Sequence, residues 1–472
     1  MGLSAAMEIG KNGLNIYRVA TEVTSENIAN VNTPGYSRQR VILESAPPTT
    51  ANGFPMGTGV RIATVERYYD KLLQQQLVKA QTTQGYDTTK SNVLQQIEPT
   101  FNEVSNDGLG AAITNFFGAW QDLTLNPAGS AERQAVLSRT QILTDNFNAV
   151  STTLKDAVKT QNDSLVPLTD SINATLNNIA QLNGQIKTTE LVSGNANETR
   201  DQRDQLVRDL SRQIGITYTE NSDGTTNVNY ADGGAALVTG STAGVFSLDK
   251  ITDPTKFAVQ LTPAGGALAA PVTPTTGQLG ATLYLRDDTN GGIPSYLAKV
   301  DALASQIVGQ VNKLHNITTN PLKAYDLNGA TGGDFFDNAG ITAATISLNA
   351  GITGTDKIAA SGSATSLGDN SNALALAQLQ GKSVMSGNTA TFGSYFDGLV
   401  STVGLDVQSA KNTEAQDIAF TKQLTTLRES NSGVSLDEEL TNMIKYQRSY
   451  QASAKLITTA TEMMDTVIAM IR

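Results

Sequence analysis

The chain has 472 residues, a formal net charge of -11 and no cysteine. The acidic balance argues against nucleic-acid binding, which needs basic patches, and the lack of cysteine excludes disulfides, thiolate metal sites and cysteine nucleophiles. No run of about 18 apolar residues is present, so no membrane-spanning segment is expected. Glu8, Lys11 and Arg18 interrupt what would be the apolar region of a cleavable signal peptide.

A first helix is predicted from Leu3 to Asn30. Its apolar residues recur at alternating steps of four and three, which is typical of a coiled-coil seam. Gly10, Thr21 and Thr24 weaken the pattern, although a glycine lets a neighbouring backbone approach closely. An ordinary helix packed on its own core is the alternative. The predicted seam residues are Leu3, Met7, Leu14, Tyr17, Ile28 and Val31.

A turn ends this helix. Pro34 disfavours a helical conformation at Thr33, and Pro34 and Gly35 fit the central positions of a type II turn. Extended segments are predicted at 38–43 and 60–65, on either side of a loop rich in Pro, Gly and Thr. The residues of the turn motif are Asn30, Asn32, Thr33, Pro34, Gly35 and Tyr36.

Helices are then predicted at 69–98, 107–125, 131–191 and 197–213. Ile113, Phe116, Phe117 and Trp120 share one helical face, so the only tryptophan is interpreted as a core residue. Pro167 is expected to kink or break the long third helix. The charged face of the last of these helices is interpreted as solvated, with local ion pairs; its residues are Asp201, Arg203, Asp204 and Arg208.

From Ile214 the pattern becomes that of strands. Alternating residues around Asn221-Ser222-Asp223-Gly224 predict a β-hairpin, and further strands are predicted at 245–248, 257–261 and 279–285. A glycine-rich loop at 320–369 is predicted to hold strands near 345–348 and 357–360. Helices are predicted at 295–316, 372–383 and 392–431.

The last helix is predicted from Val434 to Arg472. Ser435 and Glu438 form the pattern of a capping box. A second coiled-coil seam follows, interrupted by the polar residues Gln447 and Thr461. Its predicted seam residues are Leu436, Leu440, Met443, Tyr450, Ala454, Ile457, Met464, Ile468 and Ile471.

These elements predict a mainly α fold with a β-rich insertion, in which terminal coiled-coil helices, a bundle of long helices and a small β tip domain are nested like a hairpin. The N-terminal helix is expected to pair with the C-terminal one. The predicted domains are an N-terminal helix (1–36), a helical middle domain (37–213), a β-rich tip (214–292), the return part of the middle domain (293–433) and a C-terminal helix (434–472).

No pattern points to catalysis, to a cofactor or to a metal. His315 is the only histidine and is interpreted as structural. The segment Asp326–Gly329 begins like a calcium loop, but the later ligand positions fail, so a turn is the favoured interpretation and a weak ion site the alternative. The pairs Gly233-Gly234 and Gly265-Gly266 lack the lysine of a phosphate-binding loop and are interpreted as flexible turns.

Four stretches resemble the bacterial flagellar axial proteins, and among these the hook-associated proteins. One is the turn motif with its neighbours, Ala29 to Gln39. The others are Asp201–Leu206, His315 with Asp326–Gly329 and Gly333–Phe336, and the start of the last helix, from Ser432 to Ala452. The β region matches poorly.

The resemblance implies a non-enzymatic adaptor that forms the junction between hook and filament. Such proteins are secreted through the flagellar type III export channel and guarded by a cytoplasmic chaperone, here expected on the C-terminal helix. They form a ring that contacts the hook protein and the second junction protein, with no nucleic-acid or membrane partner. The expected location is the extracellular flagellum.

Two alternatives remain. The chain could be another axial protein, from the hook, the rod or the second junction, although the stretch around Asp201 and the C-terminal match argue against this. A secreted adhesin or enzyme on helical stalks is the alternative from a different class. No cluster of aromatic residues or carboxylates marks a binding site for it.

Overall fold

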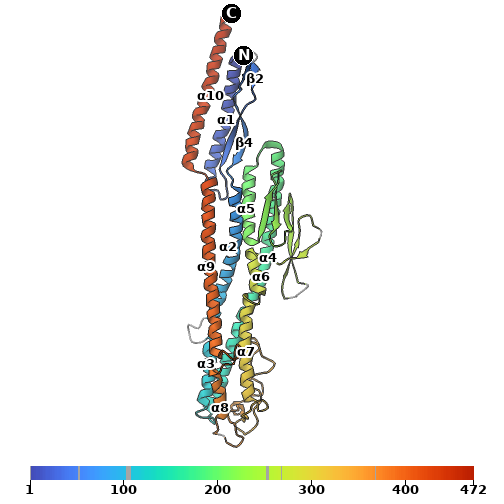
Figure 1. The fold of residues 1–472 in the computed structure, drawn as a ribbon, viewed down its shortest axis with the longest axis vertical. Helices are drawn as coiled ribbons and strands as arrows, with labels where there is room; N and C mark the ends of the chain where they lie inside the picture. The colour runs from blue at the N-terminus through green and yellow to red at the C-terminus, as the bar shows by residue number, and fades with distance from the viewer. Residues whose placement is uncertain are drawn as a thin grey trace. The chain divides into compact units, whose positions relative to one another are not determined.

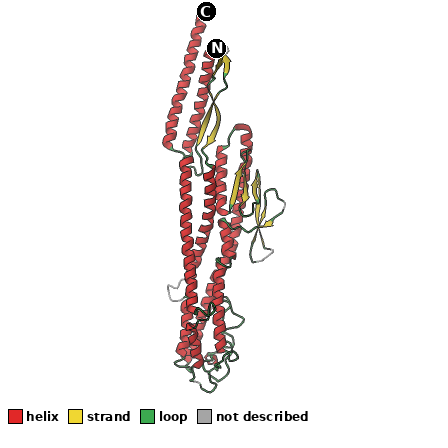
Figure 2. Ribbon diagram, viewed as in Figure 1, coloured by secondary structure: helices red, strands yellow, loops and turns green. Residues whose placement is uncertain are grey.

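The computed structural model describes residues 2–51, 54–101, 108–250, 255–266, 268–366 and 368–471. Long helices carry most of the chain, and short strands form small antiparallel sheets (Figures 1 and 2). The chain divides into two compact units. The first comprises Met1–Gly85, Pro167–Gly277 and Gln416–Arg472, and the second Tyr86–Val166 and Gln278–Ala415.

In the first unit the terminal helices α1 (Gly2–Ala29) and α10 (Leu436–Ile471) lie side by side (Figure 1). The turn motif after α1 leads into β1 (Gln39–Ser45), which pairs antiparallel with β4 (Val60–Arg67). Within the loop between them, β2 (Thr49–Ala51) and β3 (Phe54–Met56) form a small hairpin that the sequence did not predict.

The first unit also holds α5 (Asn197–Gln213) and two sheets. The predicted hairpin is confirmed, with Ile216 paired to Tyr230 and Glu220 to Thr226. The four-stranded sheet contains β5 (Ile216–Glu220), β6 (Thr226–Tyr230), β7 (Ala236–Thr239) and β8 (Thr242–Ala243), and the three-stranded sheet β9 (Val245–Asp249), β10 (Ala258–Thr262) and β11 (Ala270–Pro271).

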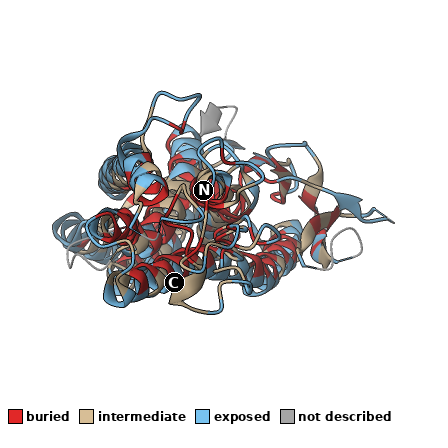
Figure 3. Cartoon of the chain, turned by 90° about the horizontal axis from the view of Figure 1, so that it is seen from below, coloured by how far each residue is buried: buried red, intermediate tan, exposed pale blue. Residues whose placement is uncertain are grey.

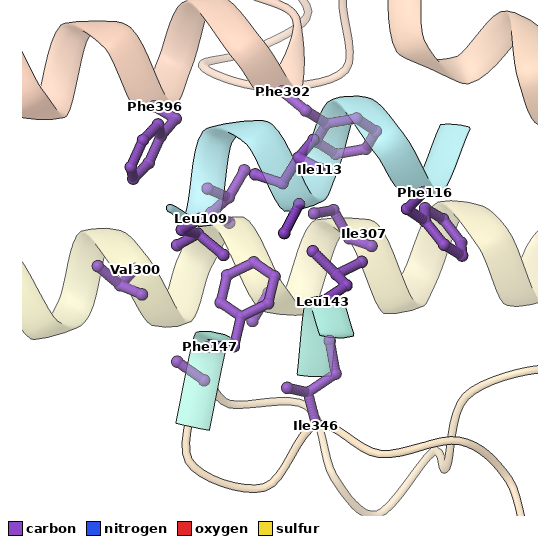
Figure 4. Close-up of a cluster of buried hydrophobic side chains, with 14 of the residues drawn as sticks. Leu109, Ile113, Phe116, Leu143, Phe147, Val300, Ile307, Ile346, Phe392 and Phe396 are labelled. Carbon is purple, nitrogen blue, oxygen red and sulfur yellow. The ribbon is translucent and has the colours of Figure 1, made fainter. Parts of the chain in front are cut away.

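The second unit is built on one large apolar core (Figure 4). Helix α3 (Leu109–Leu123) contributes Phe116, Phe117 and Trp120, all fully buried, which confirms the predicted core face. Phe117 stacks on Phe392 at the start of α9 (Phe392–Ser432), with ring centroids 5.6 Å apart. The core also draws on α7 (Ile293–His315), α8 (Ser371–Ala377) and parts of α2 (Lys71–Ile97) and α4 (Ser130–Ser193).

Three local predictions are wrong. Residues 279–285 belong to the helix α6 (Gly277–Asp287), because the buried residues Leu279, Thr282 and Leu285 follow a helical period that the run of small and apolar residues conceals. The predicted strands near 345–348 and 357–360 are irregular chain with isolated bridges. The helix predicted at 372–383 ends at Ala377 and continues only as a 3-10 turn.

The predicted break at Pro167 is also absent, since α4 continues through it. Proline removes one helical hydrogen bond, but Leu165 and Leu168 on either side of it are buried and hold the helix in place.

Residues 102–107, which include the predicted start of α3, lie outside the described part. Buried positions occupy one side of the helices and exposed positions the other (Figure 3). The mainly α fold with a β-containing insertion is thereby confirmed.

Candidate assembly surface at the paired termini

The two terminal helices pack antiparallel through small residues. A Cβ atom added to Gly10 would lie 2.7 Å from Cγ1 of Ile457, and one added to Gly13 would lie 2.7 Å from Oγ of Ser453. Towards the other end of the pair, Tyr17 and Tyr446 stack with ring centroids 6.4 Å apart. A side chain at either position would meet the facing residue, so the glycines permit this close approach.

The face of α1 that is buried is displaced by about one residue from the predicted seam. The predicted residues Leu3, Met7, Leu14, Tyr17, Ile28 and Val31 are all half-buried. The fully buried positions of α1 are Gly10, Gly13, Ile16, Ala20, Val23, Thr24 and Asn27.

On α10, by contrast, some of the predicted seam residues are half-buried and others are exposed. Met443, Ala454, Ile457 and Met464 are half-buried, whereas four apolar or aromatic residues remain exposed, namely Leu436, Leu440, Tyr450 and Ile468. The side chain of Ile471 lies outside the described part. Helix α10 thus presents apolar residues that its own chain leaves uncovered.

The turn motif has the predicted conformation. The Tyr36 amide donates to the Thr33 carbonyl at 3.2 Å, and Gly35 has a φ of 84°, as a type II turn requires of its third residue. The Thr33 hydroxyl donates to the Asn30 side chain at 3.0 Å. Asn32, Thr33 and Pro34 are exposed, while Tyr36 is buried.

Asn27 is the centre of this site, although in the sequence it is only a polar residue near the end of an apolar helix. Its side-chain oxygen accepts hydrogen bonds from the Tyr36 hydroxyl and the Gln39 amide, both at 2.9 Å. Its side-chain nitrogen donates to the Gln39 carbonyl at 2.9 Å and to Glu439 at 3.0 Å. All four hydrogen bonds of the carboxamide are therefore made in a buried setting, which ties α1, the turn motif, β1 and α10 together.

Arg38 adds an ionic link to α10. Its guanidinium lies 2.6 Å from Glu438 and 2.7 Å from the buried Glu439. The pKa of Arg38 is raised: burial alone would lower it, but these two carboxylates outweigh that effect. The partner of Glu438 is therefore an arginine between the turn motif and β1, which the predicted capping box did not indicate.

The charged face of α5 is buried, so the prediction of a solvated face is wrong. Asp201 accepts hydrogen bonds from the amide and hydroxyl of Ser37 at 2.7 and 2.8 Å. Arg67 lies 2.6 Å from Asp201 and 2.8 Å from Asp204. These charges are neutralised by residues far away in the sequence, which local spacing cannot show.

The two arginines of this face differ in their surroundings. Arg203 bonds the carbonyl of Gly224 at 2.7 Å and lies 3.1 Å from Asp204. Arg208 donates to Gln74 at 2.9 Å and to Gln205 at 2.6 Å. Burial, together with the nearby charge of Arg428, lowers the pKa of Arg208 to about 10. The face thus connects α5 to α2, to the hairpin and to the turn motif.

A polar cleft of about 650 Å³ lies between the end of α1, the turn motif, α4 and α5. Glu26 and Glu198 share a hydrogen bond there, which, with burial and mutual repulsion, raises the pKa of Glu26 to about 7. Asn30, Gln181 and Gln202 are among the other lining residues. The hydrogen bond to Glu198 therefore favours the protonated form of Glu26.

His315, Asp326 and the glycine pairs have structural roles. His315 is fully buried: Nδ1 lies 2.7 Å from the Gly333 carbonyl, and Nε2 accepts from the Ala359 amide at 2.9 Å. Asp326 accepts from the amides of Asn328 and Ala330. Gly234 and Gly265 have positive φ angles, as turns require. Within the described ranges, no three acidic or histidine side chains are grouped as a metal site would need.

Comparison with known proteins identifies the family. The model described as "Flagellar hook-associated protein FlgK helical domain" matches residues 94–336. The chain belongs to the FlgK family of flagellar hook-associated proteins. It is therefore a structural component of the bacterial flagellum. The two ends match models shared with rod proteins: "Flagella basal body rod protein" over residues 7–36, and "Flagellar basal body rod FlgEFG protein C-terminal" over residues 428–470.

Relatives match along nearly the whole chain. Flagellar hook-associated protein 1 of Bacillus subtilis is 29% identical, covering 98% of this chain and 97% of its own. The Salmonella typhimurium protein of the same name is 28% identical, covering 99% and 100%. The solved structure of the flagellar hook junction protein FlgK from Burkholderia pseudomallei has the same fold, with a TM-score of 0.65 and 19% identity over 76% of this chain and all of that one.

In the part of the chain that the structure describes, no helix combines the length and apolar character needed to cross a membrane.

Proposed function

We propose that the chain is a non-enzymatic adaptor at the junction between hook and filament, and that it assembles into a ring through its terminal helices. The observation that carries this proposal is the uncovered apolar surface of α10. Leu436, Leu440 and Ile444 are 45–60% exposed near its start, and Leu456, Met463 and Val467 are 42–56% exposed further on. Large exposed apolar patches on soluble proteins typically mark interaction sites.

These residues lie on both sides of the contact with α1. At about 100° per residue, Leu440 and Ile444 fall on one flank of the face that bears Tyr446 and Ser453, and Leu456 and Met463 fall on the other. A subunit in a ring has a neighbour on each side, so two apolar flanks are what such an assembly needs.

The far end of α10 has no partner helix in the described chain. Gly10 lies against Ile457, and the antiparallel order of the pair therefore brings Gly2 close to Met464. The residues beyond, among them Ile468 and Met470, are 56% and 79% exposed. Neighbouring subunits, the hook protein on one side and the second junction protein on the other would cover this surface in the assembly.

Before assembly the same surface needs protection. A cytoplasmic chaperone that binds α10 as an apolar helix in a groove would supply it. The chain would then leave the cell through the flagellar type III export channel and take its place outside the cell.

The location is tested by immunogold labelling of intact flagella. Label confined to the boundary between hook and filament is expected. Label along the filament, within the hook or on the cell surface would instead support another axial protein or an adhesin.

Assembly is tested separately with Leu440→Asp. Because Leu440 is 49% exposed, the variant subunit should fold normally and yet fail to join a ring or to support filament growth. Gln451→Asp, at an exposed position of the same helix, is the matched control. Normal filaments on cells that make only the Leu440→Asp protein would contradict the proposed role of this face.

A further inference from the structure

The contact between the terminal helices contains two glycines, Gly10 and Gly13, and either one leaves room for the side chain of Ile457. In the structure Ile457 lies on Gly10 and Ser453 lies on Gly13. Gly13 follows Gly10 by about one helical turn on the same buried face of α1. A slip of α10 by one turn would place Ile457 on Gly13 and the small residue Ala460 on Gly10.

Packing at the two glycines distinguishes these two registers only weakly, although a slip would also separate the stacked rings of Tyr17 and Tyr446. In either one, Ile457 lies on a residue without a side chain, and the neighbouring positions hold serine or alanine. A steric preference for one register would require a bulky side chain that clashes in the other register, and neither glycine has a side chain. Another interaction must therefore select the register.

The polar contacts at the other end of the helix pair, by contrast, can form in only one of the two registers. Glu439 is 2% exposed, bonds Asn27 at 3.0 Å and lies 2.7 Å from Arg38. After a slip of one turn in the same direction, Met443 would lie opposite Asn27, and Glu439 would move towards Val31. A buried carboxylate and a buried carboxamide would both lose partners, which is strongly unfavourable.

We infer that Asn27 and Glu439 are the residues that set the register of α10 on α1. They act as a single buried polar residue does in a coiled coil, where it specifies alignment at some cost in stability. The consequence for assembly rests on the proposed function, because the register decides which apolar residues of α10 face a neighbour. The register itself can be measured on the full-length subunit in solution.

The test uses spin labels at Glu8→Cys and Thr441→Cys, both at exposed positions in a chain without native cysteine. In the observed register these sites are about 26 Å apart along the helix pair, at 1.5 Å per residue. Double electron–electron resonance should give one narrow distance. In the Asn27→Leu/Glu439→Leu background, a second distance longer by about 6 Å should appear.

Two further measurements distinguish a change of register from a loss of folded structure. Adding Gly13→Ala together with Ser453→Gly to that background leaves room for the new methyl group in the observed register, because the serine side chain that faces Gly13 is removed. In the slipped register the methyl group would meet Ile457, so the longer distance should disappear. Helical circular dichroism checks that the terminal helices of each variant are folded, and Trp120 fluorescence checks the core of the second unit. An unchanged single distance in the folded double variant would overturn the inference. So would a broad distribution without discrete peaks, whether in the parent or in the double variant, because the polar pair would then not select between two registers.

Discussion

The guanidinium of Arg428 donates a hydrogen bond of 2.6 Å to the carbonyl oxygen of Gly35. It joins the end of α9 to the middle of the turn motif, and the same nitrogen lies 3.4 Å from the Tyr36 carbonyl. Gly35 has a positive φ and, on its other side, approaches Gln205 and Arg208 of α5. The turn is thus held between two helices, and this explains why a motif whose central residues are exposed can have a fixed conformation.

Replacing Arg428 by glutamine should loosen the turn motif. Hydrogen bonds from a charged donor typically contribute about 1.5–3 kcal/mol, so the local opening free energy should fall by about that amount. Hydrogen exchange at the amides of Tyr36 and Ser37 measures the effect. Arg448→Gln, at an exposed position of α10, is the control. Equal exchange in the two variants would show that Arg428 does not hold the turn.

The stability of the second unit should decrease with acidification because of His315. Burial lowers the pKa of this imidazole to about 4, against an ordinary value of 6.5. The unfolded chain therefore binds a proton more readily between these values. The contribution to stability is complete above pH 6.5 and is lost as the pH falls towards 4, a change of about 3 kcal/mol.

Urea unfolding followed by Trp120 fluorescence suits this test, because the rings of Trp120 and His315 lie 6.3 Å apart. In His315→Gln the difference in unfolding free energy between pH 7 and pH 4 should shrink by about 3 kcal/mol. The same pH dependence in the variant and the parent would contradict the role given to the imidazole.

In the first unit, Glu26 should make the stability fall as the pH rises, which is the opposite of the effect of His315. Its pKa is raised to about 7, from an ordinary 4.5, chiefly by the hydrogen bond to Glu198. The folded chain keeps a proton that the unfolded chain releases, so this stabilisation is complete below pH 4.5 and is lost as the pH rises through 7. Glu26→Gln should make hydrogen exchange at Asn27 to Tyr36 less sensitive to pH between 6 and 8. Glu8→Gln, at an exposed position of α1, should not change that sensitivity.

The domain boundaries predicted from the sequence can be tested by deletion. Ile214 and Gly277 are close together, since a Cβ on Gly277 would lie 2.8 Å from the Ile214 Cα atom. A short linker can therefore replace residues 216–275. No residue of that segment belongs to the large core of the second unit, so Trp120 emission and thermal unfolding of that unit should be unchanged.

The control deletion extends to Gly292, the boundary that the sequence suggested. It removes Leu285, which is buried in the core, and should destabilise the second unit by about 2–5 kcal/mol, the usual effect of removing a buried leucine side chain. If the shorter deletion also unfolds the second unit, the β-rich segment is not an independent part.

The elements that the sequence predicted correctly are those whose signal is local. The 3.6-residue period identified the core face with Phe116 and Trp120, and Pro34-Gly35 defined a turn by backbone sterics alone. The errors arise where tertiary contacts decide. Leu279 to Leu285 is short and could be a strand or a helix until its surroundings are known.

The same reasoning applies to the assembly site. The apolar stripes of α1 and α10 were visible, but a seam of alternating four and three steps does not say which of two adjacent faces meets the partner. Asn27 could not be recognised, because its function depends on Tyr36, Gln39 and Glu439 together. Asp201 has the sequence context of a solvated residue, and only Arg67 and Ser37, brought from other elements, explain its burial.

The irregular segment between Asn320 and Asp369 depends on side chains of the surrounding helices for several of its backbone hydrogen bonds. Asn312 of α7 holds the amides of Phe335 and Phe336, Arg133 of α4 holds the carbonyl of Ile358, and Asn372 of α8 holds that of Ala359. Until those helices are in place, these backbone groups can bond only to water. We therefore expect this segment to fold last, after its helical supports have met. If the chain leaves the cell unfolded, through the export channel proposed above, its middle domain would then form from the helices inward, and this segment would become ordered last.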